Sequence, residues 1–578
     1  MKQTHRTLRV SFAVLAAAAL IAGACAPPAV TPPQATTPTA TEAPQPGGRI
    51  IEGSISDIRT LQPILVTDVP SSVVSGLMYD SIITANKDNG EPEPNMATFE
   101  VSDDGLTFTF EMNADANWTD GQPVIAEDWA TGIKGVAKSN VSVRKSLFQL
   151  IEGFQAYVDG EADDITGIEI DSANPKRWSV TLSSVDCGAI FNLNGYTIPA
   201  HVFGQYLTAP EADAIDRAPE NTNPQVVNGP FVFGEWRQGD QVILRRNPDY
   251  WRGAPLVEEF VYKVVADATV LAAQLKTGEL NYGTIEPKDL ADMEAQENLT
   301  VTRTGQLGYT YIGWRTNSPN PGAQALADKR VRQALAYGLD MDQVIETVLF
   351  GEGTKQVAHH VPVQWAYPDP STLNQYPYDQ AKAKELIEEA GYTLGADGIY
   401  QRDGQPISFS IVTNSGNNTR ETLAQIAAEQ YKAIGLDVTA RFEAFQGLVT
   451  KLTEGSPEVE GVIIGWALGT NVDPYGIWHS SQIPDPAQER TGFGFTAFQS
   501  AELDAAIDQG RTPDDGDCSI ETRKEHYAKF NQILNDEQPY NFGFSGKVLH
   551  VTPNNLMNFE PGSFGTRWNI EEWWFDTN

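Results

Sequence analysis

The chain has 578 residues and a formal net charge of −36 at pH 7, and 41% of its residues are hydrophobic. A chain of this length exceeds what one hydrophobic core supports, so we expect two or three domains. The acidic balance argues against nucleic acid as a partner, because phosphate binding requires a basic surface. The sequence contains no Cys-x-x-Cys, His-Glu-x-x-His or EF-hand motif, so we expect neither a metal nor a cofactor.

The N-terminus has the layout of a secretory signal, with basic residues before an apolar run at 10–22. Residues 20–25 read Leu-Ile-Ala-Gly-Ala-Cys and resemble a bacterial lipoprotein box, with Ala22 where Leu is usual. The resemblance implies a signal peptide at 1–24 and lipidation of Cys25, whose acyl chains would hold the protein on a membrane. Plain secretion with cleavage nearby is the alternative.

A low-complexity segment follows the lipidated cysteine. Residues 25–48 are almost all Ala, Pro, Thr, Gln and Gly after Cys25, a composition that cannot build a core. As an extended polyproline II chain this tether would reach roughly 70 Å. A lipid anchor, a tether and a large acidic body predict an extracytoplasmic protein attached to the cell membrane.

Ordered structure is predicted to start near Gly48, with a strand at 49–53. Alternating apolar residues at 106–112 predict a strand, and the Asp-Gly pair at 120–121 predicts a turn. A helix is expected to begin around Ala126, because Trp129 and the apolar residues one and two turns later share one face.

A strand-helix-strand unit is predicted in the second half of the chain. Residues 407–411 and 436–442 alternate as strands do, and the residues between them have helical spacing. Thr419 can cap this helix and Gly435 can end it. The unit predicts parallel strands joined by a right-handed crossover.

The stretch 461–481 is the predicted centre of the fold and of the site. Its apolar run at 462–464 is typical of a strand buried on both faces of a parallel sheet. Ligands of open α/β sheets bind beyond the carboxyl ends of the strands, so the following loop is the candidate binding edge. The alternative is that its aromatic residues pack in a core. The candidate residues of this edge are Gly465, Trp466, Ala467, Asn471, Asp473, Tyr475 and Trp478.

Several sequence blocks together are similar to family 5 extracellular solute-binding proteins, the dipeptide- and oligopeptide-binding group that serves ABC importers. The first block runs from Val101 to Phe110 and continues through Trp118 to Asp128, and Met112-Asn113 stands where the family commonly has Leu-Arg. The other blocks lie at 228–231, 247–251, 328–337 and 378–391. Asp328 and Asp379 are predicted to cap the helices of the last two blocks.

The resemblance implies an α/β fold, a periplasmic-binding-protein-like clamshell of type II with two lobes and a third, inserted α/β domain. Two crossings of the chain, near Gly308 and Gly543, would form the hinge. The predicted boundaries are 48–80, 190–307 and 545–578 for lobe I, 81–189 for the inserted domain and 308–544 for lobe II.

A protein of this family is not an enzyme, so the resemblance implies a monomeric binding protein that captures a peptide between its lobes. It would deliver the peptide to ABC permease and ATPase subunits. The resemblance places Thr67, Asp68 and Val69 on the rim of lobe I, opposite the loop after Gly465. Peptide backbone could pair with these edges, as in strand addition.

One departure leaves the ligand class open. Peptide binders of the family usually have an Asp a few residues after Gly-Trp, where this chain reads Leu-Gly-Thr at 468–470. Asp473 lies further on and can equally shape its turn. An oligosaccharide stacked on Trp466 and Trp478 is the alternative ligand. A secreted hydrolase is a further alternative, although no nucleophile–base or metal constellation is present.

Two cysteines remain after lipidation of the first. Cys187 and Cys518 belong to different predicted domains, and a bridge between them would restrain hinge motion. We therefore expect two separate thiols, although the compartment permits a disulfide.

Overall fold

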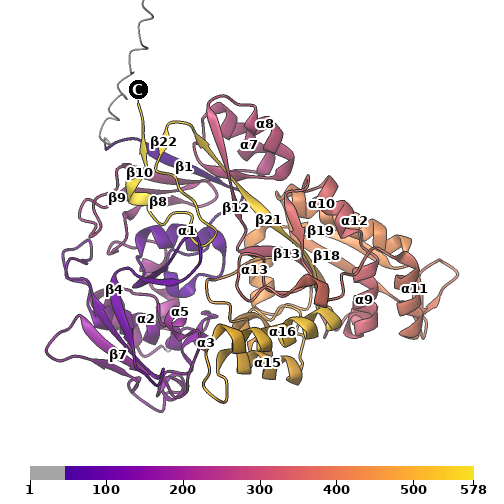
Figure 1. Cartoon of the computed structure of the whole chain (residues 1–578), viewed down its shortest axis with the longest axis horizontal. Coiled ribbons are helices and arrows are strands. Elements are labelled where there is room, and N and C mark those ends of the chain that lie inside the picture. The colour runs from indigo at the N-terminus through magenta and orange to yellow at the C-terminus, as the bar shows by residue number, and fades with distance from the viewer. Residues whose placement is uncertain (1–45, 212, 578) are drawn as a thin grey trace, which may run out of the picture. The chain divides into compact units, whose positions relative to one another are not determined.

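The computed structural model describes residues 46–211 and 213–577, which belong to one compact unit. The predicted signal peptide, the lipidation site Cys25 and nearly all of the tether lie outside the described residues. Three larger sheets organise this unit (Figure 1).

The first sheet has four strands in the order β1-β10-β9-β8, and we call the body around it lobe I. Its first strand pairs in parallel with a strand more than 200 residues away, whereas the other pairs are antiparallel. The helix α1 (Val69–Met78) contacts β8 and α7 (Ala268–Thr277) contacts β1, whereas α6 (Ala200–Leu207) contacts the helix at 126–138. The strands are β1 (Arg49–Ser54), β8 (Phe231–Arg237), β9 (Gln241–Arg246) and β10 (Glu259–Val264).

The second sheet is antiparallel, in the order β4-β5-β7-β6, and comes from the predicted inserted segment. The predicted helix is present as α2 (Ala126–Lys138), and the ring of Trp129 lies 5.6 Å from that of Trp178 on the sheet. Their core is continuous with that of lobe I, so one hydrophobic cluster joins the two sheets. The strands are β4 (Ala97–Val101), β5 (Thr107–Met112), β6 (Ile168–Ile170) and β7 (Arg177–Thr181).

The third sheet has eight strands, and we call the body around its strands β13, β18, β19 and β20 lobe II. The predicted strand-helix-strand unit is confirmed, since β18 and β19 are parallel and α12 joins them. Asn417, not Thr419, caps this helix, and Gly435 follows its end with φ +90°. The bounds are β13 (Gly308–Trp314), β18 (Ser408–Asn414), α12 (Asn418–Ala433), β19 (Asp437–Glu443) and β20 (Gly461–Ala467).

The predicted strand at 462–464 is buried on both faces, as expected. Ile463 belongs to one hydrophobic cluster of lobe II, while Val462 and Ile464 belong to the other. The expectation of a parallel sheet is only partly right, because β20 pairs in parallel with β18 and antiparallel with β13. The strand lies inside a mixed sheet, which buries both faces equally well.

Helices cover both faces of this sheet. Asp328 and Asp379 cap their helices through side-chain oxygens that accept backbone hydrogen bonds, as predicted. One group of helices is α9 (Lys329–Tyr337), α10 (Met341–Thr347), α11 (Gln380–Glu389) and α12. The other group is α13 (Phe445–Thr453), α14 (Tyr475–Trp478), α15 (Ala501–Arg511) and α16 (Ile520–Glu537).

The long strand β21 (Tyr540–Pro553) passes from one body to the other. It pairs with β13 up to Phe544 and with β12 (Leu299–Gly305) from Lys547 onward. The change of partner falls close to the predicted crossings at Gly308 and Gly543.

The remaining helices and strands are short. They are β2 (Ile83–Ala85), β3 (Pro92–Pro94), α3 (Lys145–Phe148), α4 (Phe154–Val158), α5 (Ala189–Asn192), β11 (Gly283–Ile285), α8 (Leu290–Glu294), β14 (Gly353–Lys355), β15 (Thr393–Leu394), β16 (Tyr400–Arg402), β17 (Gln405–Pro406), β22 (Leu556–Met557) and β23 (Trp574–Phe575).

The expectation of two free thiols is wrong, because Cys187 and Cys518 form a disulfide with their Cα atoms 5.2 Å apart. The loop after β7 and the loop before α16 meet at this point, although 331 residues separate the two cysteines in sequence. Local sequence patterns did not indicate that these two loops are in contact.

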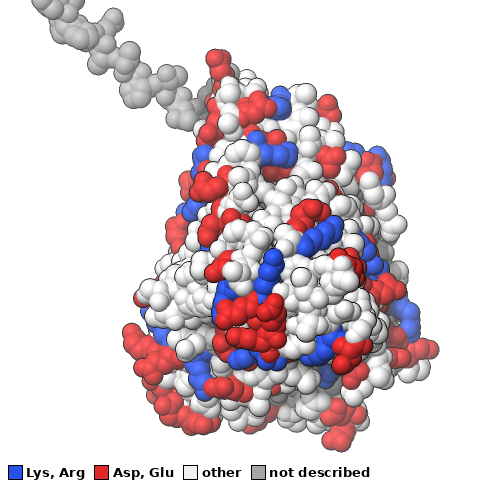
Figure 2. All heavy atoms as spheres, turned by 90° about the vertical axis from the view of Figure 1, so that its right-hand side faces the viewer, with Lys and Arg blue, Asp and Glu red and all other residues white. Residues whose placement is uncertain are grey.

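Charged side chains lie over the face shown in Figure 2, where clusters of Asp and Glu alternate with Lys and Arg. Within 46–211 and 213–577 no helix is long and apolar enough to cross a membrane.

Candidate functional site

A cavity of about 530 Å³ lies where lobe I, lobe II and the crossing strands meet. Lobe I contributes Glu52 and Val69 to its wall, and lobe II contributes Asn414, Arg420 and Gly465. Strands β18 and β20 reach the cavity with their carboxyl ends, the position at which α/β sheets bind ligands. A molecule in this cavity would contact both lobes.

Arg420 is the cation that lobe II presents to the cavity. The start of α12 positions Arg420, because the backbone N–H of Arg420 donates to the capping side chain of Asn417 at 2.9 Å. Its Nη1 donates to Asn414 Oδ1 at 2.9 Å, and no carboxylate of the described residues lies within ion-pair distance. Burial lowers the pKa of Arg420 to about 10, because the charged form loses solvation. The guanidinium group therefore lacks the anion that would compensate for its burial.

Gly465 makes room for this guanidinium group. A Cβ atom at this position would lie 2.8 Å from Nη2 of Arg420 and 3.1 Å from the carbonyl oxygen of Tyr309. Any side chain would push the arginine aside. The sequence predicted that Gly465 allows a ligand to approach the backbone closely. In the structure, the group that approaches Gly465 closely is the side chain of Arg420.

The lobe I wall carries a buried ion pair. Glu52 and Arg567 are bonded to each other, and both line the cavity. Burial raises the pKa of the Glu52 carboxyl, while Arg567 opposes that shift. The pair joins β1 to the C-terminal segment of the chain and places charge of both signs on this wall.

Glu286 of lobe I reaches the first turn of α12 in lobe II. Its carboxylate accepts hydrogen bonds from the backbone N–H of Thr419 at 3.0 Å and from Asn418 Nδ2 at 3.1 Å. A carboxylate is stabilised at a helix N-terminus by free N–H groups and by the helix dipole. This contact holds the two lobes together beside Arg420.

The three predicted residues of lobe I lie at the start of α1. Val69 lines the cavity and is 53% exposed. Asp68 caps the helix, with Oδ1 accepting from the Ser71 N–H at 2.9 Å. The hydroxyl of Thr67 accepts from Arg59 at 2.9 Å. The side chains of Thr67 and Asp68 thus stabilise the local chain that presents Val69.

Trp466 and Ala467, which follow Gly465, do not line the cavity. The indole of Trp466 is half-buried, stacks on Phe495 with ring centroids 5.0 Å apart, and donates to the Tyr540 hydroxyl at 3.2 Å. Ala467 is exposed and pairs with Gly308 in the sheet. Trp466 packs mainly on aromatic residues of lobe II.

The other four predicted residues also lie away from this cavity. The Asp473 side chain is 6% exposed and lies 3.5 Å from Arg511, and burial raises the pKa of its carboxyl. Tyr475 lies under the same guanidinium group at 4.7 Å and lines a separate cavity of about 350 Å³. Asn471 donates to Asn192 at 3.1 Å, which links lobe II to the body of lobe I.

Trp478 is buried in lobe II. Its Nε1 donates to Nδ1 of His359 at 3.0 Å, and the Tyr309 hydroxyl contacts the same nitrogen at 3.0 Å. Burial lowers the pKa of His359 well below its ordinary value and that of His360 to about 4. These rings form a neutral buried network. In the described part of the chain no cluster of His, Cys, Asp and Glu is arranged to hold a metal ion.

Sequence reasoning missed Arg420, Glu286 and the Glu52–Arg567 pair. Arg420 stands one residue after the predicted cap Thr419, so its place in the first turn of a helix at a strand end was a usable signal. The partners of Glu286 and Glu52 lie more than 130 residues away, and no local pattern indicates them.

The family model for bacterial extracellular solute-binding proteins, family 5, matches residues 91–484. The chain belongs to this family. Among its relatives is the oligopeptide-binding protein AppA of Bacillus subtilis, which is 28% identical over 92% of each chain. Di/tripeptide-binding protein 1 of Pseudomonas aeruginosa is also 28% identical, over 81% of this chain and 83% of the relative.

Solved structures show the same fold as this family 5 protein. The structure of AppA from Bacillus subtilis with a nonapeptide has a TM-score of 0.81 and 26% identity, covering 92% of this chain and 100% of AppA. Lactococcal OppA, with an endogenous peptide in the closed conformation, has a TM-score of 0.78 over 91% of this chain and 100% of its own, at 19% identity. The two-lobed α/β clamshell expected from the sequence is therefore confirmed.

Proposed function

We propose that this family 5 protein captures peptides between its two lobes and delivers them to an ABC importer. One observation carries the proposal: a cavity of about 530 Å³ is lined by both lobes and holds a cation without an anionic partner among the described residues. A ligand can favour lobe closure only through contacts that differ between the open and closed states. Contacts to both walls supply that difference.

Arg420 would hold a carboxylate of the peptide. A carboxylate beside the guanidinium group would restore the charge compensation that burial removes, and arginine presents paired donors that match a carboxylate. Val69 and Gly465 would border the same ligand, and the remaining predicted residues would hold the edges around it. The relatives named for oligopeptides and di/tripeptides support this ligand class.

An oligosaccharide is not supported by the aromatic residues that suggested it. Trp478 is buried in lobe II, and Trp466 stacks on Phe495, so neither ring lines the cavity. Chemistry on the ligand is not part of the proposal, because the family consists of binding proteins.

The proposal includes the division into lobe I, inserted domain and lobe II at the boundaries predicted from the sequence. It also includes attachment to the cell membrane through Cys25, with the protein acting as an extracytoplasmic monomer. The lipoprotein-like segment 20–25 and the Pro-rich tether support attachment.

Calorimetric titration tests the proposal with a nonapeptide that has free termini and with the same peptide amidated at its C-terminus. The protein is first freed of co-purified ligand by dialysis against guanidinium chloride and refolding. We expect saturable binding of the free peptide and at least tenfold weaker binding of the amide, because the amide cannot pair with Arg420. Equal affinity for both peptides would contradict the role of Arg420.

A further inference from the structure

The Cys187–Cys518 disulfide joins two bodies with separate hydrophobic cores. Cys187 lies two residues before α5, whose Ala189 belongs to the cluster of lobe I and the inserted sheet. Cys518 lies two residues before α16, whose Phe530 and Leu534 belong to a cluster of lobe II. The bridge is therefore a covalent link between the lobes, additional to the crossing strands.

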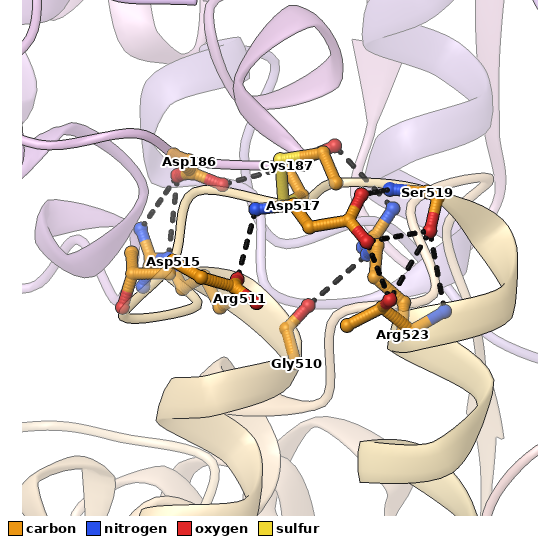
Figure 3. The surroundings of a disulfide bond; sticks show 12 residues. Asp186, Cys187, Gly510, Arg511, Asp515, Asp517, Ser519 and Arg523 are labelled. Carbon is orange, nitrogen blue, oxygen red and sulfur yellow. Dashed lines mark hydrogen bonds and ion pairs between the residues drawn. A yellow bond between two sulfur atoms is a disulfide. The ribbon is translucent and has the colours of Figure 1, made fainter.

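A buried ion cluster surrounds the bridge (Figure 3). Arg511 of lobe II donates to Asp186 at 3.2 Å and to the carbonyl oxygen of Ser146 at 3.0 Å, and lies 3.5 Å from Asp473. The side chains of Arg511 and Asp186 are each 3% exposed. Burial opposes the charge of Arg511, but the two aspartates raise its pKa above the ordinary value. The disulfide and this cluster together are here named the clasp.

Backbone groups add to the clasp. The Cys187 N–H donates to the carbonyl oxygen of Arg511 at 2.9 Å, and Arg523 Nη1 donates to the carbonyl oxygen of Cys187 at 3.4 Å. Separating a buried ion pair is strongly unfavourable, because it leaves uncompensated charge out of contact with water. With the covalent bond as well, this part of the interface between the lobes is held far more firmly than a set of surface contacts.

A different edge of the interface has weaker contacts. Arg59 of lobe I donates to the Thr450 hydroxyl of lobe II at 2.9 Å, and Gln446 of lobe II donates to the carbonyl oxygen of Asp57. Both are single hydrogen bonds between partly buried groups, and water can replace either of them when the edge opens. This edge, formed by 57–59 and 446–450, borders the cavity through Phe445.

We propose that the clasp is a second fixed point of the lobe movement. The lobes rotate about a line through the crossing strands and the clasp, so the cavity opens at the edge formed by 57–59 and 446–450. Ligand enters and leaves there. The part of this inference that concerns ligand rests on the proposed function, whereas the restricted movement does not.

Hydrogen exchange followed by mass spectrometry tests the restriction in the purified, oxidised protein. The ligand-free and nonapeptide-loaded forms are compared at two edges. The first edge is formed by 57–59 and 446–450, and the second, at the clasp, is formed by 186–192 and 510–523. We expect removal of peptide to speed exchange at least about tenfold at the first edge and to leave the second unchanged. Equal acceleration at both edges would overturn the proposal.

The double variant Cys187→Ser, Cys518→Ser is the decisive comparison, with Cys25→Ser as the matched control that keeps the clasp. Ligand-free double variant should exchange faster than wild type at 186–192 and 510–523, while the strands β18 and β19 stay protected. Exchange identical to wild type at that edge would overturn the proposal. Should the double variant not fold, wild type treated with a phosphine reductant gives the same comparison.

Small-angle scattering supplies a readout that needs no ligand. A compact chain of about 530 residues has a radius of gyration of roughly 24 Å. The ligand-free double variant should have a larger radius than ligand-free wild type, because its lobes are free to separate at the clasp. Identical radii would contradict the inference even if peptide binding fails, so the two proposals are tested separately.

Discussion

Replacing Arg420 with Met removes the proposed carboxylate partner and keeps an apolar side chain of similar length. Truncating one member of a buried charge pair in a complex costs roughly 2–5 kcal/mol. The affinity for a nonapeptide with a free carboxylate should therefore fall at least about thirtyfold. The amidated peptide should bind wild type and variant with nearly equal affinity.

Arg420→Met should weaken peptide binding without lowering the free energy of unfolding of the ligand-free protein. Burial lowers the pKa of Arg420 to about 10, which reflects the free-energy cost of holding a cation there without an anion. The side chain is half-buried, so solvent screening reduces that cost to about 1–2 kcal/mol. Loss of the hydrogen bond to Asn414 offsets about 1 kcal/mol. The free energy of unfolding of the ligand-free variant should stay constant or rise by about 1 kcal/mol.

Calorimetric titration and denaturant unfolding measure the two effects in parallel. Arg245→Met is the matched control, because Arg245 is exposed on β9 and does not line the cavity. Arg420 does not bind a ligand carboxylate if Arg420→Met binds the free peptide as wild type does, or if it loses affinity for both peptides equally. A loss of several kcal/mol in stability would show that Arg420 serves the fold instead.

Four single substitutions test other parts of the molecule. Trp466→Ala should lower the free energy of unfolding by about 3 kcal/mol with little change in peptide affinity, measured by melting and titration, since its ring packs in lobe II. Asp473→Ala should cost about 3 kcal/mol in urea unfolding, because Arg511 loses a buried counter-charge, whereas a change below 1 kcal/mol would mean that Asp186 suffices. Burial lowers the pKa of His360 to about 4, so the unfolded chain binds the proton more tightly. The stability that neutral His360 contributes is complete above pH 6.5, and about 3 kcal/mol of it is lost as pH falls toward 4. His360→Gln should therefore flatten the profile of unfolding free energy against pH between pH 6.5 and 5. Cys25→Ser should release the protein into the medium or leave its precursor uncleaved, and a membrane-bound product of mature size would contradict the anchor.

Local patterns predicted those parts of the fold that local interactions determine. The unit β18–α12–β19 followed from strand alternation, helical spacing and Gly435, because backbone geometry repeats within each element. Asp328 and Asp379 were recognised as caps because a carboxylate can reach the free N–H groups of the next turn.

Contacts between distant segments could not be predicted in the same way. The disulfide was expected to be two thiols, since sequence spacing does not show that the loops at Cys187 and Cys518 meet. Asp473 was considered as a ligand-binding group. Its side chain instead faces Arg511, which lies on α15. Of the predicted binding edge, Gly465 lines the cavity, whereas the loop after it turns into lobe II.

Native mass spectrometry of the protein purified without denaturation identifies what the cavity holds, and therefore tests peptide capture without a chosen ligand. We expect a bound population whose released ligands fragment as peptides and whose occupancy falls in Arg420→Met. A series of ligand masses separated by sugar units would contradict it. So would a protein that carries nothing and stays free when a peptide mixture is added in excess.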